Sequence, residues 1–168
     1  MQTIQSLHNT RRIQREIFYV LAGLLDNRKS AISASPKGSL FFPIERVNRT
    51  METTLVLCKP DALHRGLVGR VLTRFEEKGF QLVGLKLMTM SRDLAARHYA
   101  EHVGKPFYEG LVGFMTASPL VAVAIRGPLA VATVRKMMGK TFGLDAEPGT
   151  LRGDFGASKS FNLLHGSD

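Results

Sequence analysis

The sequence predicts an α+β domain, a two-layer sandwich in which a four-stranded antiparallel sheet carries helices on one face. From Thr53 onward, segments with strand patterns alternate with segments of helical periodicity. This alternation is typical of a helix-covered sheet and not of a helical bundle or a β-sandwich. The expected order is strand, helix, strand, two helices, strand, helix, strand. That order is the split β-α-β, or ferredoxin-like, arrangement with an insertion.

The first half of the pattern contains two strands and two helices. A strand is expected over residues 53–58, and a helix follows that ends at Gly79. The apolar side chains on one face of this helix are Leu67, Val68, Val71, Leu72 and Phe75. A second strand is expected over residues 80–88. Ser91 then predicts the start of a second helix, because its hydroxyl can cap a helix N-terminus.

The second half begins with a short helical segment over residues 107–115. A continuous apolar strand over residues 120–125 follows, of the kind that is buried on both faces. Pro128 is expected to open the next helix, because a proline at the first helical position leaves no N–H unpaired. Residues 139–160 form a long connection with five glycines, which suits a backbone that bends closely around a ligand. A last short strand is expected over residues 161–165.

The length of 168 residues, with 44% hydrophobic and 22% charged residues, suits one globular domain. We expect this domain over residues 51–168 and a poorly ordered N-terminal extension over residues 1–50. The alternative for the extension is an organelle-targeting peptide, since it starts with an Arg-rich amphipathic segment. Cys58 is the only cysteine, which permits a reducing compartment, and we expect the cytoplasm.

The net charge of +9 favours anionic partners such as nucleotides, nucleic acid or an acidic membrane surface. Residues 1–50 hold eight Lys and Arg against three Asp and Glu, so more than half of the excess lies outside the expected domain. We therefore do not expect nucleic acid as the partner, although a nucleic-acid binder stays open as a third interpretation. No apolar stretch approaches the roughly 20 residues of a membrane-spanning helix, and no membrane partner is expected.

The long connection carries the side chains Lys140, Thr141 and Arg152, and Arg135 lies one helical turn before it. Guanidinium groups match the geometry of phosphate oxygens, so these residues could hold a polyphosphate. The alternative is that they are solvated loop charges.

His165 is the second chemical candidate, since Gly166 and Ser167 leave it sterically open. A neutral imidazole can attack phosphorus near pH 7 without prior activation. Strand alternation puts Phe161 and His165 on one face and Asn162 on the other. Spacing alone therefore does not place Asn162 and His165 in one site.

Several motifs between Thr53 and Asp168 together resemble those of the nucleoside diphosphate kinase family. They are Lys59-Pro60-Asp61-Ala62, Arg65-Gly66-Leu67-Val68-Gly69, Arg74-Phe75-Glu76, His98-Tyr99, Lys105-Pro106-Phe107, Pro148-Gly149-Thr150-Leu151-Arg152-Gly153-Asp154-Phe155 and Asn162-Leu163-Leu164-His165-Gly166-Ser167-Asp168. The resemblance implies transfer of the γ-phosphate from a nucleoside triphosphate to a nucleoside diphosphate through a phosphohistidine. It also implies Mg²⁺ carried on the nucleotide phosphates.

By this resemblance His165 is the catalytic nucleophile. The implied nucleotide-binding residues are Lys59, Tyr99, Phe107, Leu111, Arg135, Thr141, Arg152 and Asn162. Among them, Phe107 matches the aromatic that stacks on the base, and Arg135 and Arg152 match phosphate ligands. The implied partners are nucleoside di- and triphosphates and further copies of the chain, in a hexamer or a tetramer.

The sequence departs from the family pattern at three places. Ser160-Phe161 stands where Gly-Arg is usual, and Phe142-Gly143 stands where Asn-Pro is common in a loop associated with subunit packing. The sequence ends at Asp168, whereas relatives continue into a final helix with a glutamate that orients the catalytic imidazole. We therefore expect a C-terminally truncated kinase domain. The alternative is a catalytically weak nucleotide-binding or partner-binding domain.

Overall fold

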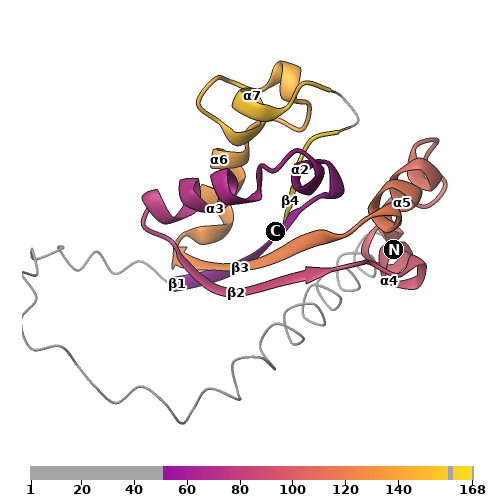
Figure 1. Cartoon of the computed structure of the whole chain (residues 1–168), viewed down its shortest axis with the longest axis horizontal. Coiled ribbons are helices and arrows are strands. Elements are labelled where there is room, and N and C mark those ends of the chain that lie inside the picture. Colours follow the sequence, from indigo (N-terminus) through magenta and orange to yellow (C-terminus); the bar gives the residue numbers. More distant parts are fainter. Residues whose placement is uncertain (1–50, 159–160, 168) are drawn as a thin grey trace, which may run out of the picture.

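The computed structural model describes residues 51–158 and 161–167, and the predicted extension over residues 1–50 lies outside them. The described residues form a four-stranded sheet of order β2-β3-β1-β4 in which all neighbouring strands are antiparallel (Figure 1). The strands are β1 (Met51–Cys58), β2 (Gln81–Met88), β3 (Leu120–Pro128) and β4 (Leu164–Gly166). This is the strand order of the split β-α-β arrangement, and the predicted fold class is confirmed.

One face of the sheet is covered by helices from both halves of the chain. These helices are α2 (Pro60–His64), α3 (Val68–Glu77), α6 (Ala130–Met138) and α7 (Leu151–Phe155), and they lie together above the sheet in Figure 1. Val71 and Phe75 of α3 are fully buried against Val56 and Cys58 of β1 and side chains of β3. The predicted apolar face of this helix is therefore the face that packs on the sheet.

The opposite face is covered by α4 (Arg92–His98) and α5 (Tyr108–Ala117), so the prediction of helices on one face alone needs correction. Leu55 and Leu57 of β1 point to this second core, together with Leu120 and Ala122 of β3. β1 is apolar and buried over residues 55–58 and β3 over residues 120–125, so both faces of the sheet need a cover there. The apolar run over residues 120–125 had predicted that this strand is buried on both faces. Ser91 caps α4 as predicted, its hydroxyl accepting from the Leu94 N–H at 3.2 Å.

The start of α6 differs from the prediction. Pro128 is the last residue of β3, opposite Met51 of β1, and does not open the helix. Leu129 adopts a left-handed conformation with φ of 50°, and α6 begins at Ala130. The Glu52 carboxylate accepts a hydrogen bond from the Val131 N–H at 3.1 Å, which satisfies a donor in the first turn. The hydrogen bond between Glu52 of β1 and Val131 therefore stabilises the first turn of α6, a role that the sequence had assigned to Pro128.

The long connection after α6 is more ordered than its composition suggested. It contains the 3-10 helix η2 (Gly143–Asp145) and the helix α7, whose cap Thr150 accepts from the Gly153 N–H at 3.0 Å. A Cβ at Gly153 would collide with the carbonyl of Glu147, and one at Gly143 would collide with the backbone of Gly156. Gly143 and Gly153 therefore allow the connection to pack closely on itself, and its close approach to a ligand stays a prediction.

The last strand is shorter than predicted and turns sharply before it begins. Leu163 has φ of 65°, a conformation that is rare for a bulky side chain, and β4 starts only at Leu164. The Leu163 carbonyl accepts from the Lys59 N–H at 2.8 Å, which holds this turn against the end of β1. Among the described helices, none is long and apolar enough to cross a membrane.

Candidate active site

The predicted nucleophile His165 is the central residue of β4 and pairs with Leu57 of β1. The next residue, Gly166, lies directly beneath α6, where a Cβ would be 2.7 Å from the sulfur of Met138. The Arg135 guanidinium on α6 donates to the Gly166 carbonyl at 3.1 Å. Close packing at this glycine therefore brings Arg135 next to the histidine strand.

Arg152, on α7, is 8% exposed and donates to backbone carbonyls on both sides of the site. Its Nε reaches the Asn162 carbonyl at 3.0 Å, its Nη2 the Leu164 carbonyl at 2.6 Å and its Nη1 the Gly139 carbonyl at 3.1 Å. Burial, and secondly the nearby Arg135, lower the pKa of Arg152 to about 10, so it stays charged at neutral pH. It ties the long connection to β4 by charge-assisted hydrogen bonds.

Lys59 and Asn162 form a buried polar pair at the ends of β1 and of the turn before β4. The Lys59 Nζ donates to the Asn162 Oδ1 at 2.6 Å, and the Asn162 Nδ2 donates to the Thr141 carbonyl at 3.0 Å. Burial, followed by Arg152, lowers the pKa of Lys59 to about 8, while Asp61 acts in the opposite direction. Leu163 has a left-handed backbone, so the alternation of side chains expected along a strand does not hold between Asn162 and His165. Lys59, which donates to Asn162, also lowers the pKa of His165.

Aromatic rings from the end of α4 lie against His165. The His98 ring is 4.7 Å from the His165 ring, centroid to centroid, and the Tyr99 ring is 6.1 Å from it. The Phe107 ring is 53% exposed and contacts His102 at 5.4 Å. Leu111 lies one turn further along α5 and packs partly buried against the second core. The exposed Phe107 face is therefore open to a planar ligand.

The electrostatic surroundings of His165 keep its imidazole neutral. Its pKa is well below the ordinary value because of burial first, then His98, and then the three cations Lys59, Arg135 and Arg152. Protonation would add a fourth positive charge to this cluster. At neutral pH the ring therefore keeps a nitrogen lone pair for attack.

The structure brings most of the nine predicted residues to one place. Lys59, Arg135, Arg152 and Tyr99 lie around His165, and Asn162 is joined to them by its hydrogen bond with Lys59. Phe107 precedes the neighbouring helix α5, and Leu111 lies on it. Thr141 is exposed and joins the group through its backbone carbonyl alone. His98 also lies in this site and was missed as a site residue, because its helical position predicted only a side chain on the packed face of α4.

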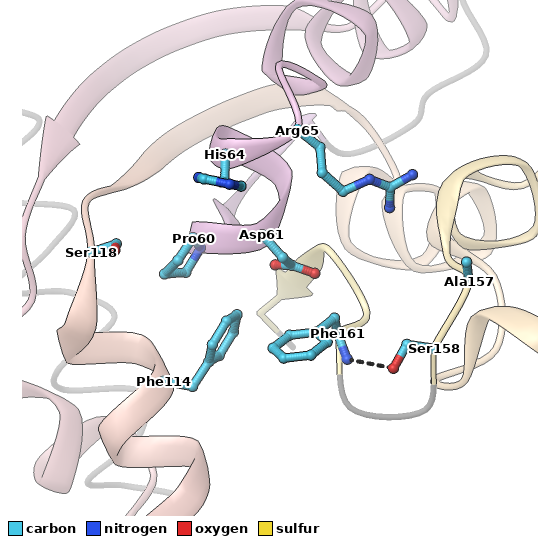
Figure 2. A pocket seen from close by; sticks show the side chains of 9 residues that line it. All are labelled: Pro60, Asp61, His64, Arg65, Phe114, Ser118, Ala157, Ser158 and Phe161. Atoms are coloured by element: carbon cyan, nitrogen blue, oxygen red, sulfur yellow. Dashed lines mark hydrogen bonds between the residues drawn. The ribbon is translucent and has the colours of Figure 1, made fainter.

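A separate pocket of about 480 Å³ lies beside α2 and the end of α5. It is lined by Pro60, Asp61, His64, Arg65, Phe114, Ser118, Ala157, Ser158 and Phe161, and none of the nine predicted site residues is among them. Figure 2 shows the rings of Phe114 and Phe161 side by side below Asp61; they meet edge to face, with centroids 5.2 Å apart. Four of its nine lining residues are apolar, and His165 is not among them.

The site contains cations where a protein-bound metal would need anions. Within the described part of the chain, no group of three or more His, Cys, Asp or Glu side chains could hold a metal ion. The charged side chains that act on His165 are all positive. This donor set suits an anionic ligand that brings its own counter-ion.

Comparison with known proteins decides the family. The family model described as nucleoside diphosphate kinase matches residues 52–168. The chain belongs to this family. It is 57% identical over 117 residues to a nucleoside diphosphate kinase of Thermus thermophilus, covering 70% of this chain and 85% of the relative. It is 54% identical over 118 residues to one of Carboxydothermus hydrogenoformans, covering 70% and 79%.

A solved structure supports the same assignment. It is a halophilic nucleoside diphosphate kinase from Halobacterium salinarum in complex with CDP, which is 49% identical and superposes with a TM-score of 0.70. The alignment covers 71% of this chain and 78% of that one. The family and the enzyme class expected from the sequence, a nucleotide-binding nucleoside diphosphate kinase, are therefore confirmed.

Proposed function

We propose that this nucleoside diphosphate kinase transfers the γ-phosphate of a nucleoside triphosphate to His165, and from there to a nucleoside diphosphate. One observation carries the proposal: a neutral imidazole lies among three cationic side chains, Lys59, Arg135 and Arg152. The imidazole supplies the nucleophile, and the cations stabilise the negative charge of the transferring phosphoryl group. Phosphoryl transfer requires mainly such positioning and charge stabilisation.

The attacking atom is Nδ1 of His165. Nε2 of the same ring is buried without a hydrogen-bond partner among the described residues, and Nδ1 is not among these buried atoms. In the first half-reaction the Nδ1 lone pair forms the bond to phosphorus, and the bond from phosphorus to the bridging oxygen breaks. The leaving nucleoside diphosphate keeps that electron pair. The second half-reaction is the reverse, with a different diphosphate as the acceptor.

The other predicted residues have complementary roles in this proposal. Arg135, Thr141 and Arg152 bind the phosphates, and Lys59 with Asn162 lies near the ribose and the transferred group. The half-exposed Phe107 ring offers an apolar face on which any base can stack, with Leu111 beside it. Tyr99 stands next to the histidine. The expected base selectivity is therefore low.

Mg²⁺ would enter this site on the nucleotide. The cationic side chains fit the phosphates, and the phosphates together with water would be the main ligands of the ion. When bound, Mg²⁺ neutralises part of the phosphate charge during transfer. Lys59, Arg135 and Arg152 would hold the same phosphates from the protein side.

We also propose that residues 51–168 form the working domain, that it acts in the cytoplasm, and that it assembles into a hexamer or a tetramer. The exposed side chains Phe142 and Leu144 support the assembly, because exposed apolar side chains are common at subunit contacts. Both lie on the connection between α6 and α7.

Intact mass after incubation with ATP and Mg²⁺ tests the proposed chemistry. The wild-type chain should gain one phosphoryl group that is labile in acid and stable in alkali, as a phosphoramidate is. His165→Asn should lose the adduct, and His64→Asn, a matched change at an exposed histidine, should keep it. Labelling that survives in His165→Asn would contradict the assignment. Nucleotide binding without any adduct in the wild type would favour the weak nucleotide-binding alternative.

A further inference from the structure

The pocket beside α2 contains a carboxylate, unlike the cationic histidine site. Its volume of about 480 Å³ lies in the range of small-molecule sites. The rings of Phe114 and Phe161 form one side of it, and the Asp61 carboxylate lies above them (Figure 2). A cavity that combines aromatic rings with a carboxylate suits a cation that also has an apolar part.

The Asp61 carboxylate has unused capacity to accept hydrogen bonds. Its Oδ2 accepts from the Leu163 N–H at 3.0 Å, whereas Oδ1 is buried and accepts from none of the described residues. Most buried polar atoms in folded proteins are paired, so an unpaired carboxylate oxygen calls for an explanation. A donor supplied by a ligand in the pocket would pair it.

Two cations lie close to this carboxylate, and both donate to other groups. Lys59 donates to Asn162 at 2.6 Å, and Arg65 donates to a backbone carbonyl at 2.6 Å. The family usually has an arginine at the position where this chain has Phe161. Beside Asp61 the chain therefore has an aromatic ring where a further guanidinium is usual.

We propose that this pocket is a second binding site, for a cation that carries a guanidinium group on an aliphatic stem, as arginine does. The guanidinium donates to the Asp61 carboxylate and lies against the Phe161 ring, because this planar group both pairs with carboxylates and stacks on aromatic faces. The terminal torsion of an aspartate is broad, so a small rotation directs Oδ1 into the cavity. Binding here involves no group transfer and does not depend on the phosphohistidine route.

Two sources can supply this group. One is a free small molecule. The other is the chain itself, because residues 1–50 contain Arg11, Arg12 and Arg15. These residues precede Met51, the first residue of β1, and the pocket lies beyond the other end of this strand. The chain between Arg15 and Met51 is long enough to reach that end.

Isothermal titration calorimetry of the full chain, without nucleotide, tests the site. The probe is Nα-acetyl-L-arginine methylamide, and the uncharged Nα-acetyl-L-citrulline methylamide is its control of the same shape. Asp61→Asn removes the charge but keeps an acceptor for the Leu163 N–H, and Phe161→Arg places a guanidinium of the chain beside Asp61. Asp93→Asn is the matched control, because Asp93 also lies in the first turn of a helix but is exposed and outside the pocket.

The wild type should bind the arginine probe with a Kd of about 0.1–1 mM, and the citrulline probe at least about tenfold more weakly. Asp61→Asn and Phe161→Arg should each weaken binding of the arginine probe by about ten- to a hundredfold, which corresponds to the loss of one hydrogen bond between charged groups. Asp93→Asn should bind it within about twofold of the wild type.

A full chain with Arg11→Gln, Arg12→Gln and Arg15→Gln distinguishes the two sources. Tighter binding of the arginine probe to this variant than to the wild type would identify residues 1–50 as the source, and unchanged binding would identify a free small molecule. The proposal would be overturned if neither chain bound the arginine probe or if the citrulline probe bound equally well. Wild-type affinity in Asp61→Asn would also overturn it. The comparison of the two probes on the wild type needs no variant to fold.

Discussion

Removing the Arg152 guanidinium should weaken the fold as well as the reaction. Three of its hydrogen bonds are 3.1 Å or shorter, and they join residues on both sides of the site. A hydrogen bond to a charged group contributes about 1.5–3 kcal/mol, and neighbouring contributions are not additive. Arg152→Ala leaves three carbonyls without this donor, and it should lower the free energy of unfolding by about 3–5 kcal/mol. The corresponding fall in melting temperature is about 10–20 °C.

Arg152→Lys gives the sharper test, because it keeps the charge and most of the stem. A single ammonium cannot replace the planar fork that reaches Gly139, Asn162 and Leu164 together. We expect the free energy of unfolding to fall by about 2–3 kcal/mol, which corresponds to the loss of roughly one to two hydrogen bonds to a charged group. The exposed Arg126 on β3 supplies the control, since Arg126→Ala should change stability by less than about 0.5 kcal/mol.

Urea unfolding followed by circular dichroism, in the absence of nucleotide, measures these differences. Stability of Arg152→Lys within about 0.5 kcal/mol of the wild type would refute the structural role. Activity assays on the same proteins then show how much of the activity loss remains at temperatures where Arg152→Ala is fully folded. A remaining loss of activity would support the proposed role of Arg152 as a phosphate ligand, and no remaining loss would contradict it.

The other predictions concern pH, the base and two glycines. Because the pKa of His98 falls from 6.5 to about 4 on folding, the unfolded chain binds the extra proton between these values. Stability present above pH 6.5 should therefore decline by about 3 kcal/mol as pH falls to 4, and urea midpoints of His98→Phe should lack this part of the decline. Phe107→Ala should weaken binding of ADP, GDP, CDP and UDP alike, by about 1–3 kcal/mol in calorimetry, whereas loss for one base only would contradict stacking. Gly153→Ala should destabilise by about 1–3 kcal/mol through its clash with the Glu147 carbonyl. Gly69→Ala, in open space on α3, should be neutral or stabilise by up to about 1 kcal/mol, and urea unfolding measures both glycine variants.

Periodicity and composition were sufficient for the main architecture. The strands β1, β2 and β3 and the helices α3 and α4 lie within a few residues of their predicted bounds, because each has a regular apolar pattern or a cap such as Ser91. The motif around His165, the Arg152-Gly153-Asp154-Phe155 segment and the Lys59-Pro60-Asp61 start, taken together in this order, predicted the family, which the comparisons confirm. These features depend on residues close together in the chain, so a linear sequence contains them.

Contacts between distant residues decided the rest. Leu129 and Leu163 are bulky residues in a rare left-handed conformation; Leu163 is fully buried in the core, whereas Leu129 is 42% exposed. The sequence predicted Arg152 as a phosphate ligand. It did not predict the hydrogen bonds that Arg152 donates to the carbonyls of Asn162 and Leu164, because only the fold brings these carbonyls to it. His98 has the spacing of a core residue, and only the pairing of β4 with β1 brings His165 beside it. A local pattern can predict which residues are polar or apolar, but the tertiary fold determines which of them meet, because that depends on the free energy of the whole packed chain.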